Sequence, residues 1–313
     1  MTDPPGVSFV VTVYNKESFL EATLLSILRQ DGSFEREFIV IDDGSADRSL
    51  EIAGDLVGTL PNGTVIRQAN SGPAHALNAA VAAAGLPVIK PVDGDDMLTP
   101  DATVRLLKGL DDPRVGLVRG VARPIPHAGA PLRIERDSEN PVFRIIDDPL
   151  PTAIRHSMAG CSEVMFRRRA FMECGGCDPS VFVQDYSLMW RLAVHNAFAF
   201  SDDIVVFAPP AYESSLIHNH LQVQHDRNAA LCGMLRDFPD LPHAVKRIAV
   251  NRAAGRAWKW ARRHNGTPLG MDRTFWLWLA SYLPWLPDYR RCLAATLVPF
   301  TRTGPIRRPD GSA

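Results

Sequence analysis

The sequence predicts an α/β fold: a mostly parallel central sheet with helices on both faces, followed by a helical C-terminal region. In the first 120 residues, short β-rich apolar runs alternate with amphipathic segments, as in a parallel sheet covered by helices. From about His220 onward, the periodicity is helical. The chain has 313 residues, 46% of them apolar, so it can bury a full core and carry an appendage.

The expected elements follow from apolar periodicity and from helix start and stop signals. The expected strands are 7–13, 38–41, 65–67, 88–92 and 204–207. The expected helices open with Ser18 and Glu21 in a capping box, with Pro73 in a first turn, with Thr99 as a cap, and at Asp185. Residues 124–151, rich in proline and charge, are expected to form a long loop.

Charge is distributed unevenly along the chain. The net charge is -1, but from Val245 to the end there are 13 Lys and Arg against 3 acidic residues. A basic tail favours polyanions or an anionic membrane surface, while the acidic remainder suits metal binding and argues against broad contact with nucleic acid.

The first thirty residues and the cysteines indicate the compartment. Acidic and polar residues interrupt the first thirty positions, so we expect no signal peptide and a soluble cytoplasmic protein. The odd number of cysteines, five, argues for reduced thiols. Cys174 and Cys177 form a C-x-x-C without a second pair, so the sequence favours neither zinc binding nor redox work there.

Acidic residues cluster where two expected strands end. Asp42-Asp43 follows the second strand, and Asp93-Gly94-Asp95-Asp96 follows the fourth. In an open parallel sheet, ligands bind beyond the carboxyl ends of the strands. Three carboxylates around a glycine form a hard-oxygen site suited to Mg²⁺ or Mn²⁺ bridging a diphosphate. The alternative, that the cluster caps a helix or lies in solvent, stays open from the loop alone.

Four motifs occur together in one order and spacing. They are VSFVVTVYNKESFLEATLLSILRQ, FIVIDDGSADRS, NSGPAHALNAAV and VIKPVDGDDMLTPD. In this arrangement the chain resembles the family 2 glycosyltransferases, which have the GT-A fold, a Rossmann-like sheet. The resemblance runs from about residue 7 to residue 212 and implies an inverting enzyme. A processive polysaccharide synthase is disfavoured, because we expect no transmembrane spans and because Gln224 to Arg227 is followed by Asn228 instead of the tryptophan of a Gln-x-x-Arg-Trp signature.

The resemblance also implies the residues of a donor site. The nucleotide sugar would be held by Val13, Tyr14, Asn15, Glu17, Asp42, Asp43, Asn70, Gly72, Asp93 and Gly94. Asp42 would support its neighbours, and Asp93 would touch the ribose or the sugar. Asp95 would bind Mn²⁺ or Mg²⁺, with Asp96 assisting. His218 is a candidate for the same metal, although a surface or core histidine is an equal interpretation.

A second segment matches the acceptor half of the family. It reads GCSEVMFRRRAFMECGGCDPSVFVQDYSLMWRLA. The resemblance implies that Asp185 is the general base, with Gln184 where the family usually has glutamate. One carboxylate within reach of an acceptor hydroxyl is enough for a base. A plain N-cap role for Asp185 is the alternative and is compatible with catalysis.

These observations give an expected domain plan and function. Residues 1–215 would form the catalytic domain, with a nucleotide-sugar half (1–120) and an acceptor half (121–215), and 216–313 a helical region. The enzyme would be a metal-dependent hexosyltransferase that uses a UDP-sugar and a glycan or lipid-linked acceptor, in cell-surface polysaccharide biosynthesis. The rival interpretations are a sugar nucleotidyltransferase, disfavoured by a first loop without glycine, and a sugar-nucleotide or glycan binding protein without turnover.

The C-terminal region combines basic residues with tryptophans, in WKWARRH and FWLWLASYLPWLP. The apolar part is too short to span a bilayer, which takes about 20 apolar residues, and Pro284 and Pro287 interrupt it. Helices packed on the catalytic domain are the default expectation. The sharper hypothesis is peripheral contact with anionic lipid at the inner face of the membrane.

Overall fold

The computed structural model describes residues 5–125, 140–209, 219–266, 268, 272–284, 286 and 288–309. The chain divides into two compact units. The sheet unit comprises Met1–Pro149, Ala159–Cys177 and Leu192–Tyr212, and the helical unit comprises Leu150–Met158, Asp178–Arg191 and Glu213–Ala313. The predicted domain boundary between residues 215 and 216 lies outside the described residues.

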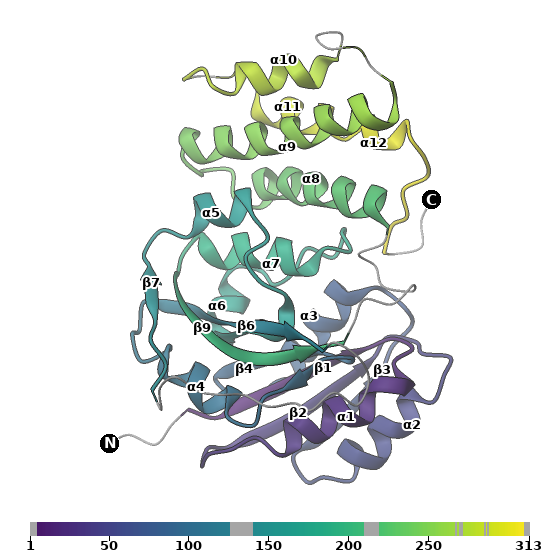
Figure 1. Ribbon diagram of the computed structural model, residues 1–313, viewed down its shortest axis with the longest axis vertical. Helices are drawn as coiled ribbons and strands as arrows, with labels where there is room; N and C mark the ends of the chain where they lie inside the picture. The colour runs from purple at the N-terminus through teal and green to yellow at the C-terminus, as the bar shows by residue number, and fades with distance from the viewer. Residues whose placement is uncertain are drawn as a thin grey trace. The chain divides into compact units, whose positions relative to one another are not determined.

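The sheet unit is built on a mixed sheet (Figure 1). Its strands are β1 (Val7–Val13), β2 (Arg36–Asp42), β3 (Gly63–Arg67), β4 (Val88–Asp93), β5 (Met97–Leu98), β6 (Val115–Pro124), β7 (Arg144–Ile146), β8 (Val164–Arg167) and β9 (Ala197–Ala208). Their order is β3-β2-β1-β4-β8-β6-β9-β5, with β7 on β9. The first four strands of this order are parallel, as predicted for the nucleotide-sugar half. Beyond β4 the sheet contains antiparallel pairs, starting with β8.

Helices cover both faces of the parallel half (Figure 1). The helices there are α1 (Glu17–Leu28), α2 (Ser49–Ala53) with a π-helical turn (Gly54–Gly58) and α3 (Pro73–Ala83), whereas α4 (Ala102–Lys108) contacts β6, β8 and β9, and α6 (Arg168–Glu173) contacts β8. Side chains of a strand alternate between faces. Phe9 and Val11 accordingly pack in one core with Leu20 and Leu24 of α1, while α3 contacts β1 and β2 from outside that core.

The predicted start of the first helix is wrong in detail. The helix begins at Glu17 with Lys16 as N-cap, and no side chain caps it. The N–H groups of Lys16 and Glu17 instead donate to Ser49 Oγ (2.8 Å) and Asp47 Oδ2 (3.0 Å) of the next loop. Contacts with residues distant in the sequence therefore satisfy the N–H groups of the N-cap and of the first helical residue.

The predicted cap of α4 is also wrong. The N-cap is Asp101 rather than Thr99. The backbone N–H of Thr99 donates to the carbonyl of Val205 (3.0 Å), so the pairing of β5 with β9 continues through this residue. The helix therefore starts two residues later than its sequence signal.

The segment after β4 departs most from expectation. The predicted long loop 124–151 contains strand β7 and the start of helix α5 (Leu150–Arg155), with residues 126–139 outside the described part. Strands β6 and β8 were not predicted, and β9 is longer than the expected 204–207. The four residues of β8 carry too little periodicity to be read from sequence, whereas β6, with ten residues, was missed despite its length.

The helical unit consists of α5, α7 (Gln184–Ala193, whose last two residues belong to the sheet unit) and five later helices. These are α8 (His220–Asp237), α9 (His243–His264), α10 (Arg273–Ala280), α11 (Tyr289–Ala295) and α12 (Val298–Thr301). This confirms the predicted C-terminal helices. Trp190 is fully buried and packs edge-on against Phe238, 6.0 Å between ring centroids. Across the described residues, no helix has both the length and the apolarity needed to span a bilayer.

Gly44 and Gly54 provide a matched test of the backbone beside the acidic loop. Gly44 has φ +78°, and a Cβ there would lie 2.9 Å from the Asn70 nitrogen. Gly54 has φ -59°, and its Cβ would meet nothing within 4 Å. We expect Gly44→Ala to lower the free energy of unfolding by about 1–3 kcal/mol. Gly54→Ala should leave it unchanged or raise it by up to about 1 kcal/mol. Urea denaturation measures both, and equal effects would contradict this account.

Candidate active site

The two acidic loops meet on either side of the end of β1. Val13 pairs with Asp42 of β2, and Thr12 pairs with Asp93 of β4. The N–H of Asp43 donates to the Val13 carbonyl (2.8 Å), and the N–H of Gly94 donates to the Thr12 carbonyl (3.1 Å). The structure therefore places the two clusters at one edge of the sheet, where ligands of open α/β sheets bind.

The loop after β1 is tied to the loop after β2. Asn15 is a non-glycine residue with positive φ (51°), a conformation that asparagine tolerates better than most. Its N–H donates to Ser45 Oγ (3.0 Å), and its side-chain carbonyl accepts from the N–H of Ala46 (2.8 Å). Glu17 accepts from the Arg48 N–H (3.1 Å). Asn15 and Glu17 therefore shape the loop, and Tyr14 is left 49% exposed at its tip.

Asp43 anchors the loop between β3 and α3. Its buried carboxylate accepts from Gln68 Nε2 (2.7 Å) and from the backbone N–H groups of Ser71 and Gly72 (2.9 Å each). Gly72 has φ 86° and ψ 165°, a region that is essentially restricted to glycine. The exposed Asn70 lies in the segment held in this way. Direct contact of these residues with a nucleoside stays a prediction.

Asp42, the last residue of β2, is fully buried at the same edge of the sheet. Its carboxylate accepts from the Ser45 N–H (3.2 Å to the nearer oxygen) and lies 3.6 Å from the Arg67 guanidinium. Its backbone carbonyl accepts from the Gln68 N–H (2.9 Å). The supporting role of Asp42 at a nucleotide-sugar site stays a prediction.

The loop 93–96 is packed tightly against the loop after β1. A Cβ on Gly94 would lie 3.2 Å from the Thr12 carbonyl oxygen and 3.3 Å from Lys16 Cγ, so glycine suits this approach. The Gly94 carbonyl accepts from Thr23 Oγ1 of α1 (3.2 Å). Lys16 Nζ lies 2.6 Å from Asp95 Oδ2, as an ion pair with little solvent exposure. Asp95, the predicted metal ligand, thus already holds one cation.

Burial perturbs two charged groups around this loop. Burial, followed by the charge of Asp95, raises the pKa of Asp96 to about 6, against a hydrogen bond with Ser162. Burial also lowers the pKa of Lys90, a fully enclosed side chain of β4, to about 7, although Asp96 and other acids oppose it. The Lys90 ammonium donates to the carbonyls of Ser162 (2.5 Å) and Pro91 (3.0 Å).

Ser162 connects these groups and was missed by the sequence reasoning. It lies in a 3-10 turn (Cys161–Glu163), and its Oγ accepts from the backbone N–H of Asp93 (2.9 Å). Lys16 and Lys90 were missed as well. The sequence did contain an indication for Lys90: a lysine in the middle of an apolar strand is rarely buried without a partner, so it could have been expected to bind a nearby polar group.

The carboxylates of this loop fit a divalent cation that is bound partly by the protein and partly by a substrate. Asp95 and Asp96 supply hard oxygens, and Asp95 lies against an ammonium cation. Over the described ranges, no three His, Cys, Asp or Glu side chains converge closely enough to hold a metal by themselves. Mg²⁺ is commonly bound by one or two carboxylates together with substrate phosphates. His218, the other predicted ligand, lies outside the described residues.

Asp185 occupies the first turn of α7 in the helical unit. Ser157 Oγ donates to its carboxylate (3.2 Å). Burial raises the pKa of Asp185, opposed by the Tyr186 N–H, by Arg227 and by Ser157. A carboxylate with a raised pKa is a stronger proton acceptor, which suits a general base.

Neighbouring contacts fix the start of α7. The Tyr186 hydroxyl donates to the Ile154 carbonyl of α5 (2.7 Å), and Arg256 of α9 lies over the Tyr186 ring. The N–H of Phe182, just before α7, donates to Asp226 of α8 (2.9 Å). Three helices therefore set the position of Asp185.

Cys174 and Cys177 are both buried near the end of α6. The side chain of Asn78 bonds both backbone polar groups of Cys177 (2.8 and 3.0 Å). Cys174 Sγ donates to the Phe171 carbonyl (3.3 Å). This C-x-x-C thus forms part of a packed turn.

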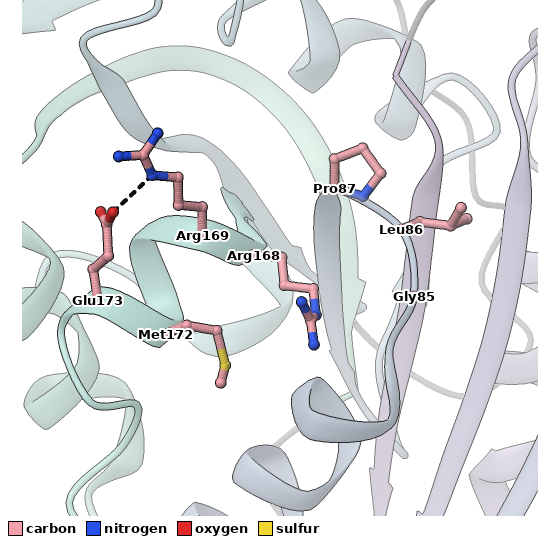
Figure 2. Close-up of a pocket in the computed structure, with 7 residues that line it drawn as sticks. All are labelled: Gly85, Leu86, Pro87, Arg168, Arg169, Met172 and Glu173. Atoms are coloured by element: carbon pink, nitrogen blue, oxygen red, sulfur yellow. Dashed lines mark hydrogen bonds and ion pairs between the residues drawn. The ribbon is translucent and has the colours of Figure 1, made fainter.

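A cavity of about 410 Å³ lies at the opposite end of β4 from the acidic loop (Figure 2). Its lining comes from the turn before β4 and from α6: Gly85, Leu86, Pro87, Arg168, Arg169, Met172 and Glu173. Figure 2 shows Arg169 paired with Glu173 rather than directed at an open site (2.6 Å). The cavity is therefore separate from the candidate active site.

The structure defines an α/β protein with two acidic loops at one edge of its sheet, and sequence comparison narrows this class. Residues 8–175 match the family described as Glycosyl transferase family 2. This match covers more than half of the chain, so the protein belongs to glycosyltransferase family 2.

Two curated relatives share part of the sequence. The protein named "Uncharacterized glycosyltransferase EpsJ" of Bacillus subtilis is 39% identical over 114 residues, 36% of this chain and 33% of EpsJ. Poly-beta-1,6-N-acetyl-D-glucosamine synthase of Staphylococcus epidermidis is 25% identical over 188 residues, 60% of this chain and 45% of the synthase. The chain thus matches less than half the length of these relatives.

Two solved structures confirm the predicted GT-A-like fold. S. aureus TarS 1–349 in complex with UDP-GlcNAc superposes with a TM-score of 0.66 at 15% identity, covering 94% of this chain and 89% of TarS 1–349. The mannosyltransferase PcManGT from Pyrobaculum calidifontis, in complex with GDP-Man and Mn²⁺, gives 0.58 at 19% identity, covering 96% and 87%. At these identities the likeness concerns the fold alone.

The Lys16–Asp95 pair can be tested as an interaction without any ligand. In EDTA, a double-mutant cycle with Lys16→Met and Asp95→Asn should give a coupling energy of about 0.5–1 kcal/mol, reduced by added salt. The exposed Arg48–Glu51 pair serves as the control and should couple more weakly. Denaturant unfolding of the variants measures both. A coupling no greater than that of the control would show that Lys16 does not hold Asp95.

Proposed function

We propose that this chain is an inverting, non-processive, metal-dependent glycosyltransferase of the hexosyltransferase type. It moves a sugar from a nucleotide-diphosphate donor to a hydroxyl of a glycan or lipid-linked acceptor. The observation that carries the proposal is the convergence of two acidic loops at the end of β1, where Asp95 meets Lys16. Acidic and basic groups side by side suit a metal-bound diphosphate better than a neutral ligand.

The donor side uses the edge formed by β1, β2 and β4. The exposed Tyr14 ring and Asn70 lie in the loops that Asn15 and Asp43 hold in place. These groups bind the nucleoside, and Asp93 contacts the ribose or the sugar. The UDP-GlcNAc bound to TarS and the GDP-Man bound to PcManGT support a nucleotide-sugar donor, with UDP-sugar preferred here. The relative that is a polysaccharide synthase supports a role in cell-surface polysaccharide biosynthesis.

Asp95 and Asp96 would hold the divalent cation, Mn²⁺ or Mg²⁺. When bound, the cation supplies positive charge next to the leaving diphosphate. The Mn²⁺ in the PcManGT complex supports this choice. Lys16, already beside Asp95, adds a second positive charge at the same place. Ser162, which binds the backbone of Asp93, keeps the loop in position.

Asp185 acts as the general base on the acceptor. It removes the proton of the acceptor hydroxyl while the oxygen forms a bond with the anomeric carbon. The bond from that carbon to the diphosphate oxygen breaks, and the nucleoside diphosphate leaves with the electron pair. One displacement of this kind inverts the anomeric configuration.

For the domain plan, we propose that residues 1–215 form the catalytic domain and residues 216–313 a helical region.

Donor binding is the direct test of the proposed function. In thermal-shift assays with Mn²⁺ and UDP-, GDP- or dTDP-sugars, one donor should stabilise the protein by about 2.7 kcal/mol at a hundredfold excess over its Kd. Asp95→Asn should lose the Mn²⁺-dependent part of this shift, whereas Asp202→Asn, at an exposed aspartate of the sheet unit, should keep it. If no nucleotide sugar shifted the melting temperature, the proposal would be wrong.

Asp185→Asn tests the base. The variant should keep donor affinity and lose transfer by about 100- to 10,000-fold, and Asp185→Glu should recover part of it. Since burial raises the Asp185 pKa, the rate should fall on acidification at a higher pH than an ordinary aspartate would give. This acidic limb in the pH profile of kcat/KM should be absent from Asp185→Asn. Donor binding by the wild type with neither transfer nor donor hydrolysis would indicate a binding protein instead.

A further inference from the structure

Helix α10 and the turn after it expose a cluster of large apolar side chains. Trp276 is 59% exposed, Tyr282 65% and Leu283 59%, and Leu279 lies between them at 39%. Trp276 and Leu279 are three residues apart on α10 and so lie on one side of the helix, while Tyr282 and Leu283 lie in the turn that follows it. We call these four residues the apolar patch.

The opposite side of α10 explains why the patch faces outward. Figure 1 shows α10 alongside α9, and the rings of Trp258 and Trp278 stack between the two helices at 5.1 Å. Phe275 lies 5.2 Å from Trp258. A Cβ on Gly255 would come within 3.3 Å of Trp278, so the helices are already close. This packing occupies one face of α10 and leaves the patch on another.

Basic residues flank the patch. Arg247 of α9 donates to the Leu283 carbonyl (3.2 Å), which places a guanidinium at one end of the patch. At the other end, Arg273 begins α10 and is exposed. The last turns of α9 carry the exposed Lys259, Arg262 and Arg263, and Arg262 follows Trp258 by one turn.

Other charged residues of the helical unit differ from these exposed ones, because they take part in the packing of the helices. Arg256 is partly buried, donates to Asn228 Oδ1 (2.8 Å) and lies over the Tyr186 ring. The acidic residues described between 243 and 309 are Asp272 and Asp288, and each accepts a backbone N–H at the start of a helix. The solvent around the patch therefore meets mainly positive charge.

We propose that the apolar patch and its basic rim dock this chain on the surface of an anionic lipid bilayer. Trp and Tyr side chains favour the boundary between lipid and water, and basic residues favour anionic headgroups. An amphipathic helix of this kind lies in the plane of the interface. A second copy fits less well, because a two-fold contact through the patch would bring the two basic rims together without acids to pair them.

The test is cosedimentation with vesicles of phosphatidylcholine alone or mixed equally with phosphatidylglycerol. The wild type should bind the anionic vesicles and be released by salt. Replacing Lys259, Arg262 and Arg263 with Gln should lower the partition coefficient by about a hundredfold, since each basic residue contributes about fivefold. Trp276→Ser with Leu283→Ser should also release the protein.

Matched control variants lie in the sheet unit. Arg29, Arg48 and Arg169, all exposed, are replaced with Gln to remove the same charge. Val142→Ser and Met172→Ser remove exposed apolar side chains, 81% and 52% exposed. These controls should bind like the wild type. Unfolding curves show whether each variant folds. If a patch variant does not fold, the proposal is tested by how binding of the wild type depends on salt and on the lipid composition of the vesicles.

Three results would overturn the proposal. They are equal binding by the wild type and the Lys259, Arg262, Arg263 variant, equal binding to neutral and anionic vesicles, and no binding by the wild type. Light scattering without lipid measures the oligomeric state. If the wild type were a dimer and Trp276→Ser a monomer, the patch would be a contact with a second copy of the chain, which would also overturn the proposal. Vesicle binding needs no sugar donor, so the inference is independent of the proposed function.

Discussion

The register of β1 between β2 and β4 is the constraint on which the candidate active site depends. Two backbone hydrogen bonds, to the carbonyls of Val13 and Thr12, start the two acidic loops on opposite sides of one strand end. A parallel strand presents its neighbours' ends at the same edge, so a shift of either strand would separate the loops. The side-chain contacts of Asp43 and Asp95 only refine a position that the backbone has already set.

Placing several carboxylates at one edge has an electrostatic cost that the surroundings reduce. Lys16 reaches Asp95 from the loop after β1, and Lys90 lies buried beneath the loop in β4. The pKa of Asp96 is raised to about 6, first by burial and then by the charge of Asp95, while the charges of Lys90 and Lys16 oppose this shift. A site with a remaining excess of negative charge favours a further cation, and a diphosphate accompanied by that cation fits it better than a bare anion.

The parallel half of the sheet could be predicted because each of its strands is a continuous apolar run that ends in polar residues. The candidate site residues from Val13 to Asp96 came from motifs, and the register of β1, β2 and β4 places Val13, Asp42 and Asp93 at one edge of the sheet. Lys16–Asp95 could not be predicted, since it joins residues 79 positions apart through a side-chain conformation. The start of α1 was misjudged for a related reason: Asp47 and Ser49, from another loop, satisfy its first N–H groups. Local sequence signals do not include such distant partners.

The uneven charge of the sequence also takes on a clearer meaning in the helical unit. Part of the basic excess is structural, because Arg256 donates to the buried Asn228 inside the helical packing. The alanines of α9, including Ala249, Ala253 and Ala257, are buried and allow its neighbours to approach closely. Helix α9 thus packs against α5, α8, α10, α11 and α12, whereas α10 packs mainly against α9. Trp276 packs edge-on against Phe275 (5.3 Å between ring centroids), yet 59% of it and 59% of Leu283 remain exposed beside basic residues. Exposed apolar groups gathered in this way are typical of a surface that binds a partner.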